Sequence, residues 1–322
     1  MTPRSVIVVK PSSLGDIVHT LPAVHFLKST FPQAEFLWIA NNEWAPLLQD
    51  NSDLTGVIGF PRNRFRGPAG LYRFFRWCGQ LSALRPDLVL DFQGLFKSAW
   101  ISRSLRAKRV LGLSDSKEAS RYFYHARAVV NADQHAVERY LELAKLAGAD
   151  VTGSAQFLLP QGRALRSLEL PDRFVVLHPF SRGTDKSLTA SEITALVKAL
   201  APHPVIVVGR SNEKCIIDRN AISLVNQTDL SQLVWLFRRA SFIVSVDSGP
   251  MHIAAAITAS LLSIHTWTNP RLVGPYNPDA WVWKDQHIFR VRSIPARGPW
   301  RNSRKRPHPV QIARFVHERL LR

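Results

Sequence analysis

Short, almost wholly apolar segments alternate with helical segments along the first half of the chain, and this alternation constrains the fold more than any other feature. The apolar segments are residues 6–9, 35–40, 56–60, 88–91 and 109–112, and helices are predicted at residues 16–30, 43–48, 71–84, 96–105 and 135–146. Short apolar strands separated by amphipathic helices are typical of a parallel sheet that is covered on both faces. The first half is therefore predicted to be a doubly wound α/β domain.

The alternation begins again after an irregular stretch at residues 150–171. Strands are predicted at residues 174–178, 204–209, 221–225, 242–246 and 261–266, and helices at 189–200, 213–219, 230–239, 250–257 and 310–321. We expect an N-terminal domain over residues 1–155, a C-terminal domain over residues 172–293, and a basic linker with a final helix over residues 294–322. Because ligands of doubly wound sheets bind beyond the carboxyl ends of the strands, we predict two Rossmann-like domains that face a central cleft.

Length and composition restrict the class of protein. A chain of 322 residues with 46% hydrophobic content suits two globular domains. No stretch has the ~20 apolar residues that a membrane-spanning helix needs, and the apolar stretch at the N-terminus is too short for a signal peptide. The two cysteines, Cys78 and Cys215, are too far apart in the sequence to suggest a disulfide framework or a metal site. We expect a reducing, cytoplasmic setting.

The charge of the chain is strongly positive. It has 42 Lys and Arg against 24 Asp and Glu, a net charge of +18, and the excess is concentrated at residues 62–76 and 290–306, which contain no acidic residue. Such clusters favour a polyanionic partner, which can be nucleic acid, anionic lipid or a phosphorylated glycan. A solvated surface is the alternative, and charge alone does not decide among these.

Polar residues stand where the first predicted strand passes into the first predicted helix, in KPSSLGDIVHTLP at residues 10–22. Gly15 lets the backbone turn tightly and approach a ligand. Asp16 and His19 are three residues apart, so they share a helix face and can address one site. The alternative is that Asp16 is only a helix N-cap.

The second half repeats this arrangement in FIVSVDSGPMHIAAA at residues 242–256. Pro250 suits the first turn of a helix, and the free backbone N–H groups there can hold an anion. In the alternative interpretation, Asp247 is only a cap and His252 is only a core residue.

A third strand end lies in VVLHPFSRGTDKS, at residues 175–187. The ammonium group of Lys186 can neutralise a diphosphate leaving group from this position. The alternative is a solvated loop lysine.

These motifs resemble those of glycosyltransferase family 9, the bacterial heptosyltransferases that build the inner core of lipopolysaccharide. The matching stretches are KPSSLGDIVHTLPAV, DFQGLFKSAW at residues 91–100, DQHAVERYLELA at 133–144, VSVDSGPMHIAAA at 244–256 and TNPRLVGPYNP at 268–278. The resemblance covers nearly the whole chain. Within the family, the basic N-terminal loop is most similar to heptosyltransferase I, which acts on Kdo-lipid A.

The resemblance implies the two-domain GT-B architecture, with the acceptor bound by the N-terminal half and ADP-heptose by the C-terminal half. It implies Asp16 as the catalytic base and no metal ion. One carboxylate with direct attack on the donor implies inversion at the anomeric carbon, and we expect no cofactor. The donor-binding residues it implies are Ser181, Lys186, Glu213, Asp247, Ser248, Gly249 and His252. We expect acceptor contacts from Ser12, Ser13, Gly15, His19, Arg62, Arg64, Arg66, Gln93 and Lys97.

The predicted acceptor contacts rest on charge and position. The three arginines follow the third predicted strand, so they are expected at the ligand-facing end of that sheet, beside Asp16. Guanidinium groups there suit the carboxylates or phosphates of Kdo-lipid A. Arg297–Arg306 is expected to contact the acidic inner membrane, at about 1 kcal/mol per basic residue, which places the protein peripherally on the cytoplasmic face.

The chain departs from the family pattern in the loop after residue 178. Ser187, Leu188 and Thr189 stand where an aromatic residue and a proline are usual, and Pro179 and Phe180 replace smaller residues. We therefore expect a donor pocket that differs in detail.

Three other functions remain open at this stage. The first is a related family 9 transferase with another sugar nucleotide or core acceptor, like heptosyltransferase II or III. The second is a sugar-nucleotide epimerase of similar two-domain form. The third is a basic nucleic-acid-binding protein, which leaves Asp16, Asp247 and His252 at the strand ends unexplained. We expect no nucleic-acid partner.

Overall fold

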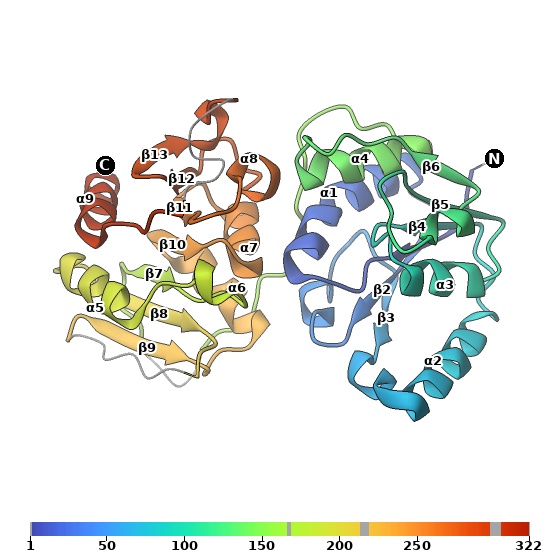
Figure 1. The fold of residues 1–322 in the computed structure, drawn as a ribbon, viewed down its shortest axis with the longest axis horizontal. Helices are drawn as coiled ribbons and strands as arrows, with labels where there is room; N and C mark the ends of the chain where they lie inside the picture. Colours follow the sequence, from blue (N-terminus) through green and yellow to red (C-terminus); the bar gives the residue numbers. More distant parts are fainter. Residues whose placement is uncertain (1, 166–168, 213–218, 297–303, 322) are drawn as a thin grey trace. The chain divides into compact units, whose positions relative to one another are not determined.

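The computed structural model describes residues 2–165, 169–212, 219–296 and 304–321. The chain divides between residues 160 and 161 into two compact units, each built around its own sheet (Figure 1). Within the described ranges, no helix is both long and apolar enough to cross a membrane.

The first unit contains a six-stranded parallel sheet in the order β3-β2-β1-β4-β5-β6. Its strands are β1 (Ser5–Val9), β2 (Glu35–Asn41), β3 (Gly56–Phe60), β4 (Leu88–Asp91), β5 (Arg109–Leu113) and β6 (Ala126–Ala128). The chain moves outward from β1 through β2 to β3 and then returns to β4 on the other side of β1. The carboxyl ends of β1 and β4 therefore form the topological switch point, where such sheets bind ligands.

Helices cover both faces of this sheet. They are α1 (Leu14–Thr30), α2 (Gly67–Leu81), α3 (Phe96–Ser104) and α4 (Ala136–Leu146), with short 3₁₀ turns η1 (Ala45–Leu47), η2 (Arg62–Phe65) and η3 (Ser120–Phe123). Phe74 and Cys78 of α2 and Ile101 of α3 pack on alternate strand residues such as Ile7. The right-handed crossover from β1 to β2 places α1 on the opposite face, where α4, which follows β6, packs against it (Figure 1).

The second unit contains a seven-stranded sheet in the order β13-β12-β11-β10-β7-β8-β9. Its strands are β7 (Val175–His178), β8 (Val205–Gly209), β9 (Ala221–Val225), β10 (Phe242–Val246), β11 (Leu261–Ile264), β12 (Trp281–Lys284) and β13 (His287–Arg290). All neighbours are parallel except β12 and β13, which form an antiparallel hairpin. Here the switch point lies between β7 and β10.

The helical elements of the second unit complete its core. They are η4 (Thr184–Lys186), α5 (Ala190–Ala199), α6 (Leu230–Arg239), α7 (Gly249–Ile257), α8 (Pro270–Val273), η5 (Val291–Ser293) and α9 (Pro309–Leu320). The C-terminal helix α9 packs on α5 and contributes Ile312, Ala313 and Val316 to the core. It is therefore part of the second unit rather than a separate segment.

Most of the predicted helices and strands are confirmed, and their ends lie within four residues of the predicted ends. The helix predicted at residues 43–48 is wrong, because only the 3₁₀ turn η1 forms there. Strands β6, β12 and β13 and the short helix α8 were not predicted. Most of the helix predicted at residues 213–219 lies outside the described residues.

Candidate active site

Asp16 lies in the first turn of α1, just beyond the carboxyl end of β1. Ser13 is the N-cap, so Asp16 is the third helical residue and the N-cap interpretation of Asp16 is wrong in position. Its Oδ2 accepts hydrogen bonds from the backbone N–H of Ser13 at 2.9 Å and from the Ser13 hydroxyl at 2.7 Å. A carboxylate that reaches back to the N-cap in this way stabilises the helix start. The half-buried Asp16 therefore has a structural role, to which a chemical one can be added.

The second oxygen of Asp16 faces a buried network. The Tyr140 hydroxyl of α4 lies 3.4 Å from Asp16 Oδ1. The Lys10 ammonium lies 5.0 Å from the centre of the Tyr140 ring and donates to the carbonyl oxygen of Phe92 at 2.9 Å. Burial by itself lowers the pKa of Lys10, but Tyr140 and the carboxylates of Asp16 and Asp91 bring it above its usual value. Lys10 therefore stays protonated and supplies positive charge behind Asp16.

The end of β4 joins this site through Gln93. Its side-chain oxygen accepts a hydrogen bond from the backbone N–H of Ser12 at 3.1 Å, which ties the loop after β4 to the loop after β1. The buried carboxylate of Asp91 holds the β4 loop in place, and burial raises its pKa. It accepts hydrogen bonds from the N–H groups of Gln93 and Gly94 and from the hydroxyls of Ser98 and Tyr124.

His19 is buried on α1, and its ring centre lies 5.1 Å from that of His135. His135 is the N-cap of α4, where its Nδ1 accepts the N–H of Val137. The loop before α4 therefore contributes to this site, and sequence reasoning did not single out His135 or Tyr140. Both residues lie in the motif at residues 133–144, so the resemblance of that motif to the family was the signal that could have identified them.

The predicted basic acceptor residues lie further from Asp16. Arg62 and Arg64 are exposed in η2, and Arg66 follows it, after the edge strand β3. They share the carboxyl edge of the sheet with Asp16, but β2 separates β3 from β1, which corresponds to about 10 Å across the sheet. Lys97 is exposed at the start of α3, where its ammonium lies 5.8 Å from the Phe74 ring of α2. The structure therefore brings Ser12, Ser13, Asp16 and Gln93 together and places the basic residues around them at greater distances.

In the second unit, an ion pair joins the two strand ends at the switch point. Lys186 Nζ, in the loop after β7, lies 2.7 Å from Oδ2 of Asp247, which directly follows β10. The Thr268 hydroxyl donates to the same oxygen at 2.8 Å. Burial by itself raises the pKa of Asp247, but the neighbouring His265 and Lys186 bring it below its usual value. Asp247 is therefore an ionised group that holds Lys186 in place.

A chain of hydrogen bonds runs from Asp247 through Thr268 and His265 to Ser263. Since the Thr268 hydroxyl gives its one proton to Asp247, it accepts from Nδ1 of His265, 2.9 Å away. The other ring nitrogen of His265 lies 3.1 Å from the Ser263 hydroxyl. Burial lowers the pKa of His265 to about 4, so the ring is neutral near pH 7. Sequence reasoning did not single out His265, which lies within the strand predicted at residues 261–266, or Thr268, which is the first residue of the 268–278 motif.

Helix α7 presents its N-terminus beside this ion pair. Ser248 is its N-cap and Gly249 its first residue, and the Ser248 hydroxyl donates to the carbonyl oxygen of Val246 at 3.1 Å. His252 is buried in the same helix, and its charge also lowers the pKa of Asp247. The first turn of α7 therefore offers backbone N–H groups and a helix dipole to an anion.

The loop that carries Lys186 is closed by the residues that depart from the family pattern. The Ser187 hydroxyl accepts a hydrogen bond from the backbone N–H of Ser181 at 2.9 Å. Phe180 and Leu188 are buried in the core of the unit, and Thr189 is the N-cap of α5. These residues therefore fix the loop that carries Lys186 against the core of the unit.

Two further residues hold this loop. The Trp267 ring, 45% exposed, has its centre 5.1 Å from Lys186 Nζ. The Arg306 guanidinium forms an ion pair with Glu192 and donates to the carbonyl oxygens of Ser187 at 2.8 Å and Asp185 at 3.4 Å. Arg306 was predicted to contact the membrane within the basic segment, but its guanidinium is held by Glu192 and by the loop that carries Lys186.

Two groups of predicted residues lie outside the described residues. These are Glu213, a predicted donor-binding residue, and residues 297–303 of the basic segment. Among the residues that are described, no three His, Cys, Asp or Glu side chains gather as a metal ion would require.

Comparison with known proteins places these features in a family. The chain matches the model of glycosyltransferase family 9 (heptosyltransferase) over residues 75–288. Lipopolysaccharide heptosyltransferase 1 of Pseudomonas aeruginosa is 30% identical over 298 residues, which cover 84% of this chain and 81% of that protein.

Two solved structures share the two-domain GT-B fold of the chain. E. coli heptosyltransferase WaaC with ADP has a TM-score of 0.79 at 23% identity, over 98% of this chain and 99% of that one. E. coli ADP-heptose lps heptosyltransferase II has a TM-score of 0.77 at 20% identity, over 98% of each chain.

Proposed function

Because the chain belongs to glycosyltransferase family 9, the heptosyltransferases, we propose that it transfers a heptose from ADP-heptose to the Kdo residue of Kdo-lipid A in the synthesis of the lipopolysaccharide inner core. The similarity to lipopolysaccharide heptosyltransferase 1 supports this acceptor. The similarity to heptosyltransferase II supports a second candidate, a II- or III-like enzyme that uses another core acceptor or sugar nucleotide.

The observation that carries the proposal is the ion pair of Lys186 and Asp247 beside the N-terminus of α7. A nucleoside diphosphate leaving group gains negative charge as its bond to the sugar breaks. The Lys186 ammonium and the first backbone N–H groups of α7 supply positive charge for a diphosphate at the switch point of this sheet. We propose that these groups stabilise the negative charge of the departing ADP, so that the reaction needs no metal ion.

Asp16 is the proposed catalytic base. The acceptor hydroxyl oxygen forms a bond to the anomeric carbon while the bond from that carbon to the diphosphate breaks, and ADP leaves with the electron pair. The hydroxyl proton passes to the Asp16 carboxylate, which has one oxygen held by Ser13 and the other facing Tyr140. A single displacement of this kind inverts the configuration at the anomeric carbon.

The basic residues after β3 are the proposed contacts for the anionic acceptor. Arg62, Arg64 and Arg66 are exposed at the same edge of the sheet as Asp16. Guanidinium groups bind carboxylates and phosphates with two parallel hydrogen bonds, which suits the head group of Kdo-lipid A. Since this acceptor is a lipid, we place the enzyme peripherally at the cytoplasmic face of the inner membrane.

Product formation with a lipid-linked acceptor tests this proposal. Purified protein is incubated with ADP-heptose and Kdo-lipid A, and both ADP release and the heptosylated lipid are measured. We expect ADP release that depends on the acceptor. Transfer only to an acceptor that already carries heptose would favour the II- or III-like candidate. Absence of transfer to any core acceptor would contradict the proposal.

A further inference from the structure

Large apolar side chains are exposed on neighbouring helices of the first unit. Leu71, Tyr72 and Phe75 of α2 and Phe96 of α3 expose between 43% and 70% of their surface. Helix α2 buries a different stripe, made of Gly70, Phe74, Cys78 and Leu81. It therefore has two apolar faces, and the sheet accounts for only one of them.

Ring contacts link Phe75 and Phe96 through Trp100, and with their neighbours these side chains form a surface that we call the aromatic band. It consists of Leu71, Tyr72, Phe75, Phe96, Trp100 and Phe123. The Trp100 ring centre lies 5.2 Å from that of Phe75 and 6.1 Å from that of Phe96, and Phe96 lies 5.7 Å from Phe123. Leu71 and Tyr72 precede Phe75 by four and three residues, so they share its side of α2. The band thus runs from α2 across α3 to η3.

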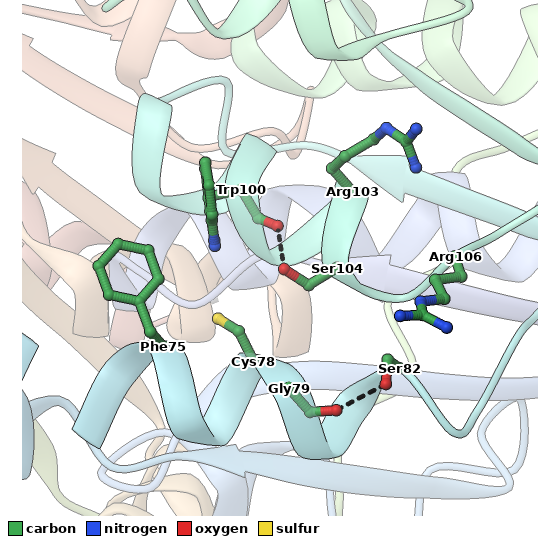
Figure 2. A pocket seen from close by; sticks show the side chains of 8 residues that line it. All are labelled: Phe75, Cys78, Gly79, Ser82, Trp100, Arg103, Ser104 and Arg106. Carbon is green, nitrogen blue, oxygen red and sulfur yellow. Dashed lines mark hydrogen bonds between the residues drawn. The ribbon is translucent and has the colours of Figure 1, made fainter. Parts of the chain in front are cut away.

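The surface is hollowed between α2 and α3. A cavity of about 290 Å³ lies there (Figure 2). Phe75 and Trp100 stand on one side of it and Arg103 and Arg106 on the other, with Cys78 between them. Aromatic and cationic groups therefore line the same depression.

The chain around the aromatic band carries no acidic residue over long stretches. Residues 54–86 contain six arginines and neither Asp nor Glu, and residues 92–114 also contain neither. Arg73 and Arg76 of α2 and Arg103 of α3 are exposed. The carboxylate of Glu118 accepts the backbone N–H of Phe96. An exposed apolar patch inside a basic field is a mark of an interaction surface.

We propose that the aromatic band and the arginines around it dock on an anionic lipid bilayer. Aromatic side chains favour the boundary between head groups and acyl chains, and basic residues are attracted to anionic lipids. This inference rests on the proposed function for the identity of the membrane, because the proposed acceptor is a lipid. Docking through this surface would bring the first unit to the membrane that holds the acceptor.

Two other occupants fit the surface less well. Nucleic acid would need free ring faces on which bases can stack, but Phe75 with Trp100 and Phe96 with Phe123 meet edge to face. A second copy of the chain would bring two strongly basic surfaces together, which is electrostatically unfavourable. An anionic bilayer complements both the charge and the exposed apolar area.

Vesicle sedimentation tests the proposal. The intact protein is mixed with vesicles of phosphatidylcholine containing phosphatidylglycerol, or of phosphatidylcholine alone. One variant combines Leu71→Gln, Tyr72→Gln and Phe96→Gln, and a second combines Arg73→Gln, Arg76→Gln and Arg103→Gln. The matched control for charge combines Arg127→Gln, Lys198→Gln and Arg314→Gln, which are also exposed. The matched control for apolar area combines Val129→Gln and Val310→Gln.

We expect the wild-type protein to bind the anionic vesicles and to bind phosphatidylcholine weakly. Each variant of the surface should lose about tenfold or more in partitioning, while both controls stay within about twofold of wild type. Circular dichroism and melting temperatures close to wild type would show that the variants fold. Undiminished binding by either surface variant, or no binding by the wild-type protein, would overturn the proposal. Equal affinity for a single-stranded oligonucleotide would overturn the choice of a bilayer.

A water-soluble acceptor separates this inference from the proposed function. With Kdo acceptor from which the acyl chains have been removed, both surface variants should transfer heptose at the wild-type rate. Vesicle binding without any transfer would contradict the proposed function and leave the docking surface intact. If the wild-type protein transferred heptose but did not bind anionic vesicles, only the proposed docking surface would be contradicted.

Discussion

Lys186 Nζ lies 2.7 Å from Asp247 Oδ2, so a cation from the loop after β7 is paired with a carboxylate at the end of β10. Asp247 is buried and also accepts the Thr268 hydroxyl, whereas Lys186 is about a quarter exposed. The carboxylate is thus fixed from three strand ends, and the Lys186 side chain remains partly exposed. This pair organises the proposed donor site.

Removal of the ammonium group should weaken binding of the leaving group. We expect Lys186→Ala to reduce the affinity for ADP by about 1–3 kcal/mol, the range for hydrogen bonds that involve a charged group. Titration calorimetry measures this directly, with Lys198→Ala, an exposed lysine on α5, as the control. An unchanged ADP affinity would rule out the phosphate contact.

Arg306 should act on ADP binding through the loop that it holds. Arg306→Ala removes the ion pair with Glu192 and the contacts with the Ser187 and Asp185 carbonyls. We expect about a tenfold weaker ADP affinity, and little restoration in Arg306→Lys, because an ammonium group cannot make the same set of contacts.

A double variant distinguishes this effect from general destabilisation. If Arg306 positions Lys186, the losses in Arg306→Ala and Lys186→Ala should not add in the combined variant. Additive losses would show that Arg306 acts independently of Lys186. Arg314→Ala, on the exposed side of α9, is the control.

Burial of His265 should make the stability of the protein depend on pH. An unfolded histidine has a pKa near 6.5, whereas burial lowers the pKa of His265 to about 4. Between these values the unfolded chain binds more protons, so stability is full above about pH 6.5 and falls as the pH decreases toward 4. From pH 7 to pH 5, this one group removes about 2 kcal/mol from the free energy of unfolding.

The variant His265→Gln should therefore lose less stability over the same range. Urea titrations at pH 7 and pH 5 measure the difference, and wild type should lose about 2 kcal/mol more than the variant. If the free energies of unfolding of wild type and variant fell equally from pH 7 to pH 5, His265 would not be protected from protonation in the folded protein. His178, whose pKa burial also lowers to about 4, should behave in the same way.

The apolar periodicity of the chain was enough to predict both sheets in outline. Residues 6–9 and 242–246 read as buried strands because every residue is apolar or small, and they are the central strands β1 and β10. The hairpin of β12 and β13 was missed because its turn residues, Asp285 and Gln286, adopt positive φ angles without glycine. The predicted helix at residues 43–48 is limited to a single 3₁₀ turn, with Pro46 near its start.

The candidate site could be predicted only in part. Lys186 and Asp247 were found because each stands at a strand end next to small polar residues. Their partner Thr268 depends on β11 lying next to β10, and strand order is not visible in the local pattern. Tyr140 was missed for a similar reason, because it reaches Asp16 through the packing of α4 on α1.

The arginines after β3 test the proposed acceptor against nucleic acid. Replacement of Arg62, Arg64 and Arg66 by Ala should raise the acceptor KM and leave the ADP affinity unchanged, because these residues belong to the first unit. A nucleic-acid-binding protein would instead lose binding of duplex or single strands, with a shallower dependence on salt. An unchanged acceptor KM at saturating donor would contradict the acceptor assignment.

The turnover of Asp16→Asn with ADP-heptose and Kdo-lipid A tests the central claim most directly. Asparagine can still accept the Ser13 hydrogen bonds that Asp16 accepts, but it cannot take a proton from the acceptor hydroxyl. If Asp16 is the base, kcat should fall by about 100-fold or more, while ADP affinity and melting temperature stay close to wild type. A variant with wild-type kcat, whatever its melting temperature, would contradict the account and leave Asp16 with only its role at the start of α1.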